Sequence, residues 1–259
     1  MIPVRIIPTL LLRNGGLVKT VNFKKYSYVG DPCNTIRIFN EMEVDELIVL
    51  DIDATKKNNG INFALLKKIA SECFMPIVYG GGIRNIDEAS KVFNIGFEKI
   101  LLNTYAYQEK NLIPELVKKY GSQAIIASID VRKNYFGNYR VFIKSGKIKI
   151  PYTPLEWALE VQKQGAGEIL LTSIDCEGTW NGFDIELTRS IAENLTIPLI
   201  ANGGAGTIND IVHVVRRGKA SAVGLSSMLL YQGKDKGVLI NFPEKNLIEE
   251  AFETYKKDE

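Results

Sequence analysis

Two glycine-rich stretches organise the sequence: Val78-Tyr79-Gly80-Gly81-Gly82-Ile83-Arg84 and Ala201-Asn202-Gly203-Gly204-Ala205-Gly206. Each follows a proline and a short apolar run, and 122 positions separate Gly81 from Gly203. The same separation relates further pairs of identical or similar residues: Asp53 and Asp175, Gly60 and Gly182, Pro76 and Pro198, Gly82 and Gly204, and Thr104 and Ser226. A repeat of this length indicates an internal duplication of half the chain.

Consecutive glycines at the end of a strand let a ligand approach the backbone and leave N–H groups free to bind an anion. A helix N-cap pattern follows each stretch, Asn85-x-x-Glu88 after the first and Thr207-x-x-Asp210 after the second. The positive end of a helix dipole would strengthen each anion site. Two stretches in register predict a substrate with a phosphate at each end, whereas a single glycine run is usually only a turn.

The composition is that of an ordinary soluble globular protein, with 46% hydrophobic and 24% charged residues. A net charge of +2 gives no reason to expect nucleic acid or an anionic membrane as a partner. Three cysteines without C-x-x-C spacing argue against a disulfide framework or a zinc site. The apolar run Ile6–Leu12 is too short to span a membrane. We therefore expect a cytoplasmic protein without a metal or other cofactor.

Apolar, β-branched runs alternate with amphipathic stretches along the chain. Eight strands are predicted, at Arg5–Leu11, Glu46–Asp51, Pro76–Tyr79, Lys99–Asn103, Ala124–Ile129, Glu168–Ser173, Pro198–Ala201 and Ser221–Leu225. Eight helices are predicted, at Pro32–Met42, Asn62–Phe74, Ile86–Asn94, Pro114–Tyr120, Pro154–Gln164, Ile185–Asn194, Ile208–Arg217 and Asn246–Tyr255.

This alternation predicts a parallel sheet covered by helices. At 259 residues, a single (β/α)₈ barrel over residues 1–259 is the favoured fold, with half-barrels at about 1–120 and 121–245. An open doubly wound sheet is the alternative. The active site of such a barrel lies at the carboxyl ends of its strands. The segment Arg13–Gly30 after the first strand is a candidate mobile lid, or simply a surface loop.

Asp130 ends a buried strand, which suits a general acid or base, although helix capping or pairing with a lysine would also explain an aspartate there. Aligning the first strand of each half places Leu11 opposite Asp130. Paired carboxylates can divide acid and base roles between them. Because one member of this pair is a leucine, the sequence excludes a two-carboxylate mechanism at the symmetric position.

Five stretches of the sequence form a recognisable set: Arg5-Ile6-Ile7-Pro8, Val18-Lys19-x-Val21-Asn22-Phe23, Gly80-Gly81-Gly82-Ile83-Arg84, Gly165-Ala166-Gly167-Glu168-Ile169-Leu170-Leu171-Thr172-Ser173 and Gly203-Gly204-Ala205-Gly206. Together they resemble the cyclase subunit of imidazole glycerol phosphate synthase. The resemblance covers essentially the whole chain. It implies a (β/α)₈ barrel that binds a bis-phosphorylated ribulosyl intermediate of histidine biosynthesis. It also implies a glutaminase subunit on the amino-terminal face of the barrel, forming a heterodimer, whose ammonia crosses the barrel interior.

The resemblance assigns roles to individual residues. Phosphate contacts fall on Gly82, Asn103 and Thr104 at one end of the substrate, and on Gly203, Gly204 and Ser226 at the other. Other residues expected to line the substrate site are Lys19, Asp51, Asp175 and Glu177. A charged gate for ammonia would consist of Arg5, Glu46, Lys99 and Glu168. Asp130 matches one of the two catalytic aspartates of the family.

The second catalytic aspartate of the family falls at Leu11, which has no proton to transfer. Asn14 and Gly16 replace an acidic residue and an arginine in the adjoining loop, and Glu177 replaces an aspartate. The preferred hypothesis is a relative that keeps ammonia delivery and has lost or altered ring closure. Such relatives resemble proteins that, with a glutaminase and a separate amidotransferase, place an amidine group on a sugar of a surface polysaccharide.

Three other functions stay open from the sequence. An ordinary synthase could operate with Asp130 alone. A docking scaffold without substrate is opposed by the retained glycines and Ser226, because a scaffold has no need of phosphate sites. A related sugar-phosphate isomerase would be expected to use two carboxylates, so Leu11 also counts against that enzyme.

Overall fold

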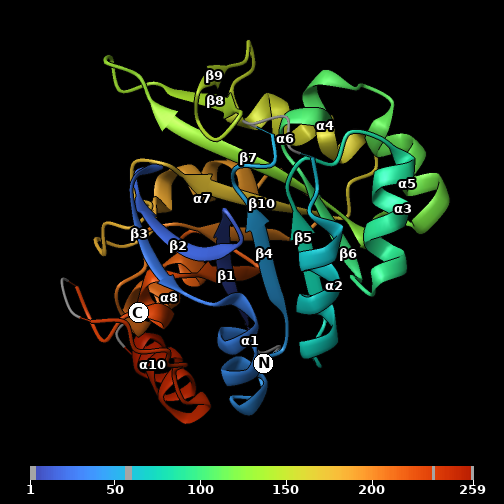
Figure 1. The fold of residues 1–259 in the computed structure, drawn as a ribbon. Coiled ribbons are helices and arrows are strands. Elements are labelled where there is room, and N and C mark those ends of the chain that lie inside the picture. Colours follow the sequence, from blue (N-terminus) through green and yellow to red (C-terminus); the bar gives the residue numbers. More distant parts are fainter. Residues whose placement is uncertain (1–3, 56–59, 235–236, 258–259) are drawn as a thin grey trace.

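A computed structural model describes residues 4–55, 60–234 and 237–257. Eight parallel strands surround a common axis, each hydrogen-bonded to the next (Figure 1). They are β1 (Arg5–Arg13), β4 (Leu47–Asp51), β5 (Ile77–Gly80), β6 (Lys99–Leu102), β7 (Ile125–Lys133), β10 (Glu168–Ser173), β11 (Leu199–Asn202) and β12 (Ala222–Leu225). Because β12 pairs with β1, the sheet closes into a (β/α)₈ barrel, which confirms the predicted fold over the open-sheet alternative.

Each of the eight predicted strands corresponds to one of these barrel strands, and their starting positions agree within one residue. The main discrepancy lies at the carboxyl ends of β1 and β7, which continue to Arg13 and Lys133 and so exceed the predicted strands. Both extensions carry the strand beyond the barrel into an antiparallel hairpin.

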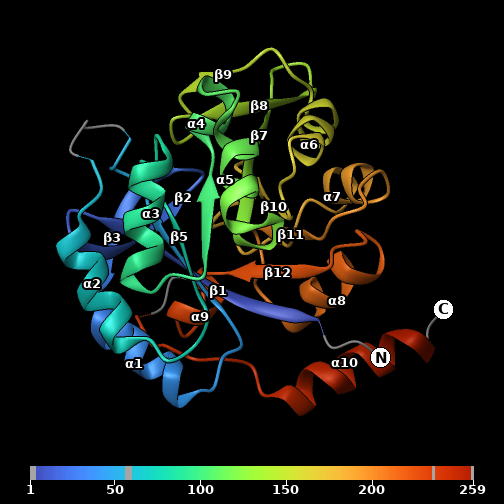
Figure 2. The same cartoon turned by 90° about the vertical axis from the view of Figure 1, so that its right-hand side faces the viewer.

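Helices cover the outside of the barrel (Figure 2). The long ones are α1 (Pro32–Glu41), α2 (Phe63–Glu72), α3 (Ile86–Ile95), α5 (Leu112–Tyr120), α6 (Pro154–Lys163), α7 (Ile185–Ala192), α8 (Ile208–Arg216) and α10 (Lys245–Lys257). These eight match the eight predicted helices. Three short elements were not predicted: α4 (Thr104–Gln108), α9 (Ser227–Leu230) and the 3₁₀ turn η1 (Ser122–Ala124).

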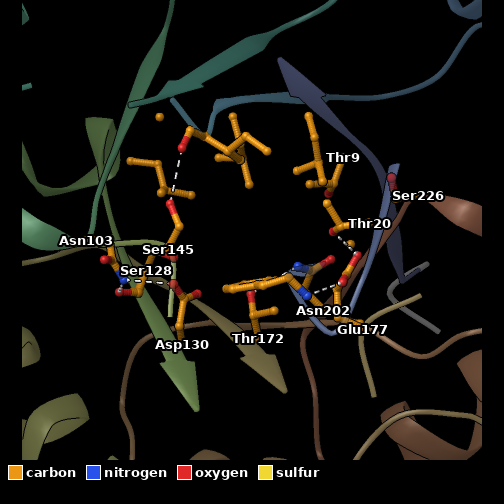
Figure 3. Close-up of a pocket in the computed structure, with 18 of the residues that line it drawn as sticks. Thr9, Thr20, Asn103, Ser128, Asp130, Ser145, Thr172, Glu177, Asn202 and Ser226 are labelled. Atoms are coloured by element: carbon orange, nitrogen blue, oxygen red, sulfur yellow. Dashed lines mark hydrogen bonds between the residues drawn. The ribbon is translucent and has the colours of Figure 1, made fainter. Parts of the chain in front are cut away.

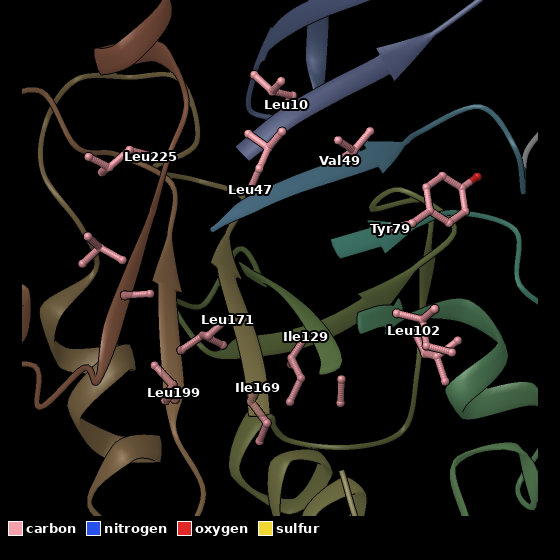
Figure 4. Packing of buried hydrophobic residues seen from close by; sticks show 14 of the residues in the cluster. Leu10, Leu47, Val49, Tyr79, Leu102, Ile129, Ile169, Leu171, Leu199 and Leu225 are labelled. Carbon is pink, nitrogen blue, oxygen red and sulfur yellow. The ribbon is translucent and has the colours of Figure 1, made fainter. Parts of the chain in front are cut away.

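Both faces of the barrel strands are buried. One residue from each strand fills the barrel interior: Ile7, Ile48, Val78, Leu101, Ile126, Leu170, Ile200 and Ala222. The intervening residues point outward and pack beneath the helices, and Leu10, Val49 and Tyr79 are examples (Figure 4). Burial on both faces explains why these strands read as continuous apolar runs instead of alternating patterns.

The segment Arg13–Gly30 is not a loop, and in this respect the sequence interpretation was wrong. It forms β2 (Gly16–Val21) and β3 (Lys24–Gly30), with β2 pairing antiparallel to the end of β1. The second half carries an equivalent excursion, β8 (Tyr139–Ile143) and β9 (Ile148–Lys149), which pairs with the end of β7. Leu11 and Asp130 lie at the corresponding positions, where each barrel strand begins to pair with its hairpin.

Among the described residues, no helix combines the length and the apolar character needed to cross a membrane. The thiols of Cys33, Cys73 and Cys176 are not joined in disulfides. Within that same part of the chain, no cluster of histidine, cysteine, aspartate and glutamate side chains has a metal-binding arrangement.

Candidate active site

A pocket opens at the carboxyl ends of the barrel strands, between the two glycine-rich stretches (Figure 3). Of the residues predicted from sequence, those lining it are Leu11, Lys19, Asp51, Gly82, Asn103, Thr104, Asp130, Glu177, Gly203, Gly204 and Ser226. Asp175 is not among the lining residues. Its side chain is exposed, and its Oδ2 accepts a hydrogen bond of 2.8 Å from the backbone N–H of Lys133. Asp175 therefore holds the end of β7 in place and does not reach the pocket.

Asp130 is the titratable group whose environment best suits proton transfer. Asp130 is only 8% exposed to solvent, and one of its carboxylate oxygens accepts a hydrogen bond of 3.3 Å from the Asn103 side-chain amide. Burial raises the pKa of Asp130 to about 7, because the favourable charge of Arg132 does not offset desolvation and Glu177 adds repulsion. A carboxyl group with this pKa can both accept and donate a proton near neutral pH.

Leu11 faces the same pocket from the other half of the barrel. The neighbouring strand contributes Leu50, which pairs with Leu11 in the sheet and also lines the pocket. Asp51, one residue further along, binds its own loop: its Oδ1 accepts hydrogen bonds from the backbone N–H groups of Asp53 and Ala54, at 3.0 and 3.1 Å. The first-half wall is therefore apolar where the second half has Asp130.

Lys19 and Glu177 are both buried and form an ion pair of 3.3 Å. Glu177 also accepts hydrogen bonds from the Thr20 hydroxyl at 2.8 Å and from the backbone N–H of Phe23 at 3.1 Å. Burial lowers the pKa of Lys19, although the charge of Glu177 opposes this effect. Glu177, which follows β10 in the second half, thus holds the β2–β3 hairpin of the first half beside the pocket.

The glycines of both stretches are required by the backbone. Gly82 and Gly204 have φ angles of +68° and +116°, which favour glycine. A Cβ on Gly82 would lie 2.9 Å from the Ala54 Cβ, and one on Gly204 would collide with the carbonyl oxygen of Gly182. The N–H of Gly182 donates to the carbonyl oxygen of Gly204 at 2.9 Å. These turns bring bare backbone to the edge of the pocket.

The side chains beside the two turns differ in their hydrogen bonding. Ser226 lines the pocket, and its hydroxyl oxygen is buried without a hydrogen-bond partner in the described structure. A buried hydroxyl usually has a partner, so this group is suited to a ligand. Thr104 is already engaged, because its hydroxyl accepts the backbone N–H of Lys144 at 3.0 Å and donates to Asn103 Oδ1 at 3.4 Å.

The helix caps predicted from the sequence are present. The side chains of Asn85 and Thr207 cap α3 and α8 by accepting the backbone N–H groups of Glu88 and Asp210. By contrast, neither α4 nor α9 has a side-chain cap hydrogen bond. Sequence reasoning missed both short helices, whose N-cap residues, Asn103 and Ser226, line the pocket.

A polar layer beneath the pocket was also missed. Thr9, Ser128, Thr172 and Asn202 each follow an interior apolar residue by two positions and line the pocket floor. The side-chain amide of Asn202 donates to the Thr172 hydroxyl at 3.0 Å. They can be identified by counting in steps of two along each strand only once the structure shows which residues form the apolar layer. Nothing in the sequence signalled Ser145, which reaches the pocket from the β8–β9 turn and donates to the carbonyl oxygen of Ile52 at 3.2 Å.

The four residues assigned to the gate form a closed ring at the opposite end of the barrel. Arg5 donates to Glu46 at 2.9 Å and to Glu168 at 3.0 Å, and Lys99 donates to the same two carboxylates at 2.7 and 2.9 Å. Burial by itself would raise the pKa of Glu168, but hydrogen bonds from Arg5 and Lys99 outweigh it and hold that pKa below its usual value. Each member lies two positions before an interior apolar residue, so the ring closes the barrel floor.

Comparison with known proteins agrees with this geometry. The family model described as histidine biosynthesis protein matches residues 5–236. A Pseudomonas aeruginosa protein provisionally named imidazole glycerol phosphate synthase subunit hisF2 is 48% identical over 96% of this chain and 99% of its own length. A similarly named Leptospira interrogans HisF protein is 39% identical over 97% of this chain and its full length. The imidazole glycerol phosphate synthase subunit HisF of Alkaliphilus metalliredigens is 37% identical over 89% of this chain and 92% of its own. The chain therefore belongs to the HisF-like family of imidazole glycerol phosphate synthase cyclase subunits.

Proposed function

We propose that this barrel receives ammonia from a glutaminase partner and delivers it at its mouth to a phosphorylated sugar or to a partner amidotransferase that amidates a sugar. The single observation that carries this proposal is Leu11, which occupies the pocket position opposite Asp130 while the gate and both glycine turns are retained. The HisF family pairs with a glutaminase subunit, and the complete ion-pair ring supports the same partner here.

The interior of the barrel supports the transport step. The ring of Arg5, Glu46, Lys99 and Glu168 stands at one end, the apolar layer follows, and the polar layer of the pocket floor lies beyond it. An apolar layer disfavours an ion strongly and a small neutral molecule much less. The arrangement thus favours passage of ammonia over passage of ammonium, which would have to lose its proton at the ring.

The loss of one carboxylate limits what the mouth can catalyse alone. Forming an imidazole ring requires protons to be taken from one position and given to another. General acid–base catalysis by one placed group is worth about 10²–10⁴ in rate. Asp130 can fill one such role with its pKa of about 7, but the leucine at the other position can fill none.

The alternative is a genuine cyclase that makes imidazole glycerol phosphate and the aminoimidazole ribotide in histidine biosynthesis. It is favoured by the raised pKa of Asp130, which suits both proton transfers in turn, and by the Alkaliphilus relative named as the synthase subunit. A non-catalytic docking scaffold is disfavoured, because a scaffold would not need the buried, unpartnered hydroxyl of Ser226 in the pocket.

The deciding experiment supplies ammonium salt and the ribulosyl bis-phosphate intermediate to the purified barrel and follows substrate loss by absorbance. Ammonium replaces the glutaminase, so the assay reports on the mouth alone. We expect negligible turnover by the native protein and measurable turnover by Leu11→Asp. Leu11→Asn is the matched control, because it has the shape and polarity of the aspartate without a titratable proton.

Robust turnover by the native protein would overturn the delivery proposal and establish the cyclase. If the native protein and Leu11→Asp are both inactive while a melting assay shows stabilisation by the bis-phosphate, the delivery function stands. The β2–β3 hairpin then becomes the next target for substitution. Absence of any stabilisation would instead favour the scaffold.

A further inference from the structure

The hairpin that leaves β7 carries several positive charges and no acidic residue of its own. Residues 131–155 contain six cations and no aspartate or glutamate, although the whole chain has a net charge of only +2. The six are Arg132, Lys133, Arg140, Lys144, Lys147 and Lys149. In the part of the chain that the structure describes, none of the six forms a salt bridge, and none lines the pocket. Lys133, Lys147 and Lys149 are exposed, whereas the charge of Arg132 also acts on Asp130 in the pocket.

Two aromatic residues stand at the tip of this hairpin. Tyr135 is 99% exposed and Phe136 is 83% exposed, and their rings meet edge to face at 5.7 Å. Large exposed aromatic residues beside one another mark interaction surfaces, because Tyr and Phe contribute a large contact area and are enriched at protein interfaces. Neither ring is covered by another part of the described chain.

The tip is ordered in advance. The side-chain oxygen of Asn134 accepts the backbone N–H groups of Phe136 and Asn138, at 3.0 and 2.9 Å. At the last strand pair before the tip, the Tyr139 hydroxyl donates to the carboxylate of Asp184 at 2.9 Å. A surface that is held in shape before binding loses less entropy when a partner docks.

The hairpin also stands in the right place. It continues the strand that carries Asp130, and β8 and β9 project beyond the barrel at the end where the strands finish (Figure 1). β7 continues from Asp130 to Lys133, and Tyr135 lies two residues further on in the turn, so the two residues are at most roughly 17 Å apart. A protein seated on Tyr135 and Phe136 would therefore lie beside the mouth, at the opposite end of the barrel from the charged ring.

From these observations we infer that the hairpin 131–150 is the docking surface for a partner protein with an acidic face and an apolar recess. This partner is the enzyme that takes up the ammonia leaving the pocket, so the inference rests on the proposed function. A protein fits better than a single-stranded nucleic acid, because rings at 87° to one another do not offer parallel faces to successive bases. Two of the cations also lie against rings of the hairpin itself, Arg132 over Phe142 and Lys133 over Tyr139.

The test begins with a photo-crosslinking amino acid at position 135 of the full-length protein in its own cells. The crosslinked protein is then purified and titrated against the barrel. We expect its affinity to fall at least about tenfold in a Tyr135→Ala, Phe136→Ala double variant. Replacing Lys147 and Lys149 by glutamate should slow association, and the effect should weaken as salt rises. Phe74→Ala is the matched control, since it removes an equally exposed aromatic residue from the other end of the barrel and should leave this affinity unchanged.

The inference would be overturned if position 135 crosslinked only to a second copy of the chain, only to nucleic acid, or to nothing. It would also be overturned if the affinity of the crosslinked protein were unchanged by both sets of substitutions. A separate assay keeps the proposed function independent: glutaminase binding and glutamine-dependent release of ammonia are measured on the same variants. If no protein partner is found at the hairpin but ammonia still passes from the glutaminase to the pocket, the docking inference fails and the proposed function stands. If ammonia does not pass, the delivery function fails as well.

Discussion

Replacing Lys99 by methionine tests whether the ring of charges is a coupled unit. Lys99 donates to Glu46 at 2.7 Å and to Glu168 at 2.9 Å, and its side chain is only 19% exposed. Methionine keeps most of the volume but leaves both carboxylates with Arg5 alone. Removing one partner from a largely buried ion pair costs about 3–5 kcal/mol, because the remaining charge stays desolvated. We expect the free energy of unfolding to fall by about that amount at pH 7.

The pH dependence gives a second readout with a definite sign. The pKa of Glu168 is held below its usual value in the folded protein, and the unfolded value is about 4.3. Its ionisation therefore stabilises the native fold above that pH, and this contribution is lost as the pH falls below it. Lys99→Met weakens the hydrogen bonding that lowers the pKa. The variant should thus lose less stability on acidification than the native protein does.

Urea unfolding at pH 7 and at about pH 3, below the unfolded pKa of Glu168, measures both effects. The control is Arg37→Met, which breaks an ion pair of similar length, 2.6 Å to Glu72, on an exposed surface, where solvent screens the charges. We expect the control to match the native protein within error. A Lys99→Met variant as stable as the native protein at pH 7, or one with an unchanged loss of stability in acid, would refute the idea of a coupled, desolvated ring.

Three further outcomes are expected. The native protein should lose stability as the pH rises from about 4 to 7, because a folded pKa of about 7 makes ionisation of Asp130 unfavourable in the folded state over that interval. Asp130→Asn should remove this loss, and unfolding measured at both pH values checks it. Gly204→Ala should destabilise by about 2–4 kcal/mol from strain and a lost hydrogen bond, more than Gly15→Ala, whose Cβ would meet open space; equal effects in thermal melts would contradict the steric argument. Glu177→Gln should speed amide hydrogen exchange in the β2–β3 hairpin, because it removes the charge that pairs with Lys19. Unchanged exchange would show that this ion pair does not hold the hairpin in place.

Much of the fold was accessible from the sequence because it depends on local chemistry that repeats. Apolar runs separated by capped helical stretches predicted eight strands and eight helices, and the structure contains all sixteen. The paired glycines revealed the duplication, since only glycine tolerates the backbone at Gly82 and Gly204. The missing carboxylate at Leu11 was also visible, because aligning two similar strands needs no tertiary information.

The β2–β3 hairpin was missed because its second strand is almost entirely exposed. The β3 segment reads as polar and glycine-bounded, which is also how a loop reads. Its position is set by a contact far away in the chain, where Thr20 and Phe23 donate to Glu177. A bond between residues more than 150 positions apart leaves no mark in a local pattern.

The sequence by itself determined the barrel, the two glycine turns and the loss of one acid–base residue. Only the tertiary structure decided which strand residues point inward, because strands buried on both faces carry no alternation to distinguish them. Closure of the barrel then placed Arg5 beside Glu168 and Lys99 beside Glu46, which converts four scattered charges into one ring. Closure also buried Asp130 and so moved its pKa to about 7, since desolvation is a property of the whole enclosure and not of the residue.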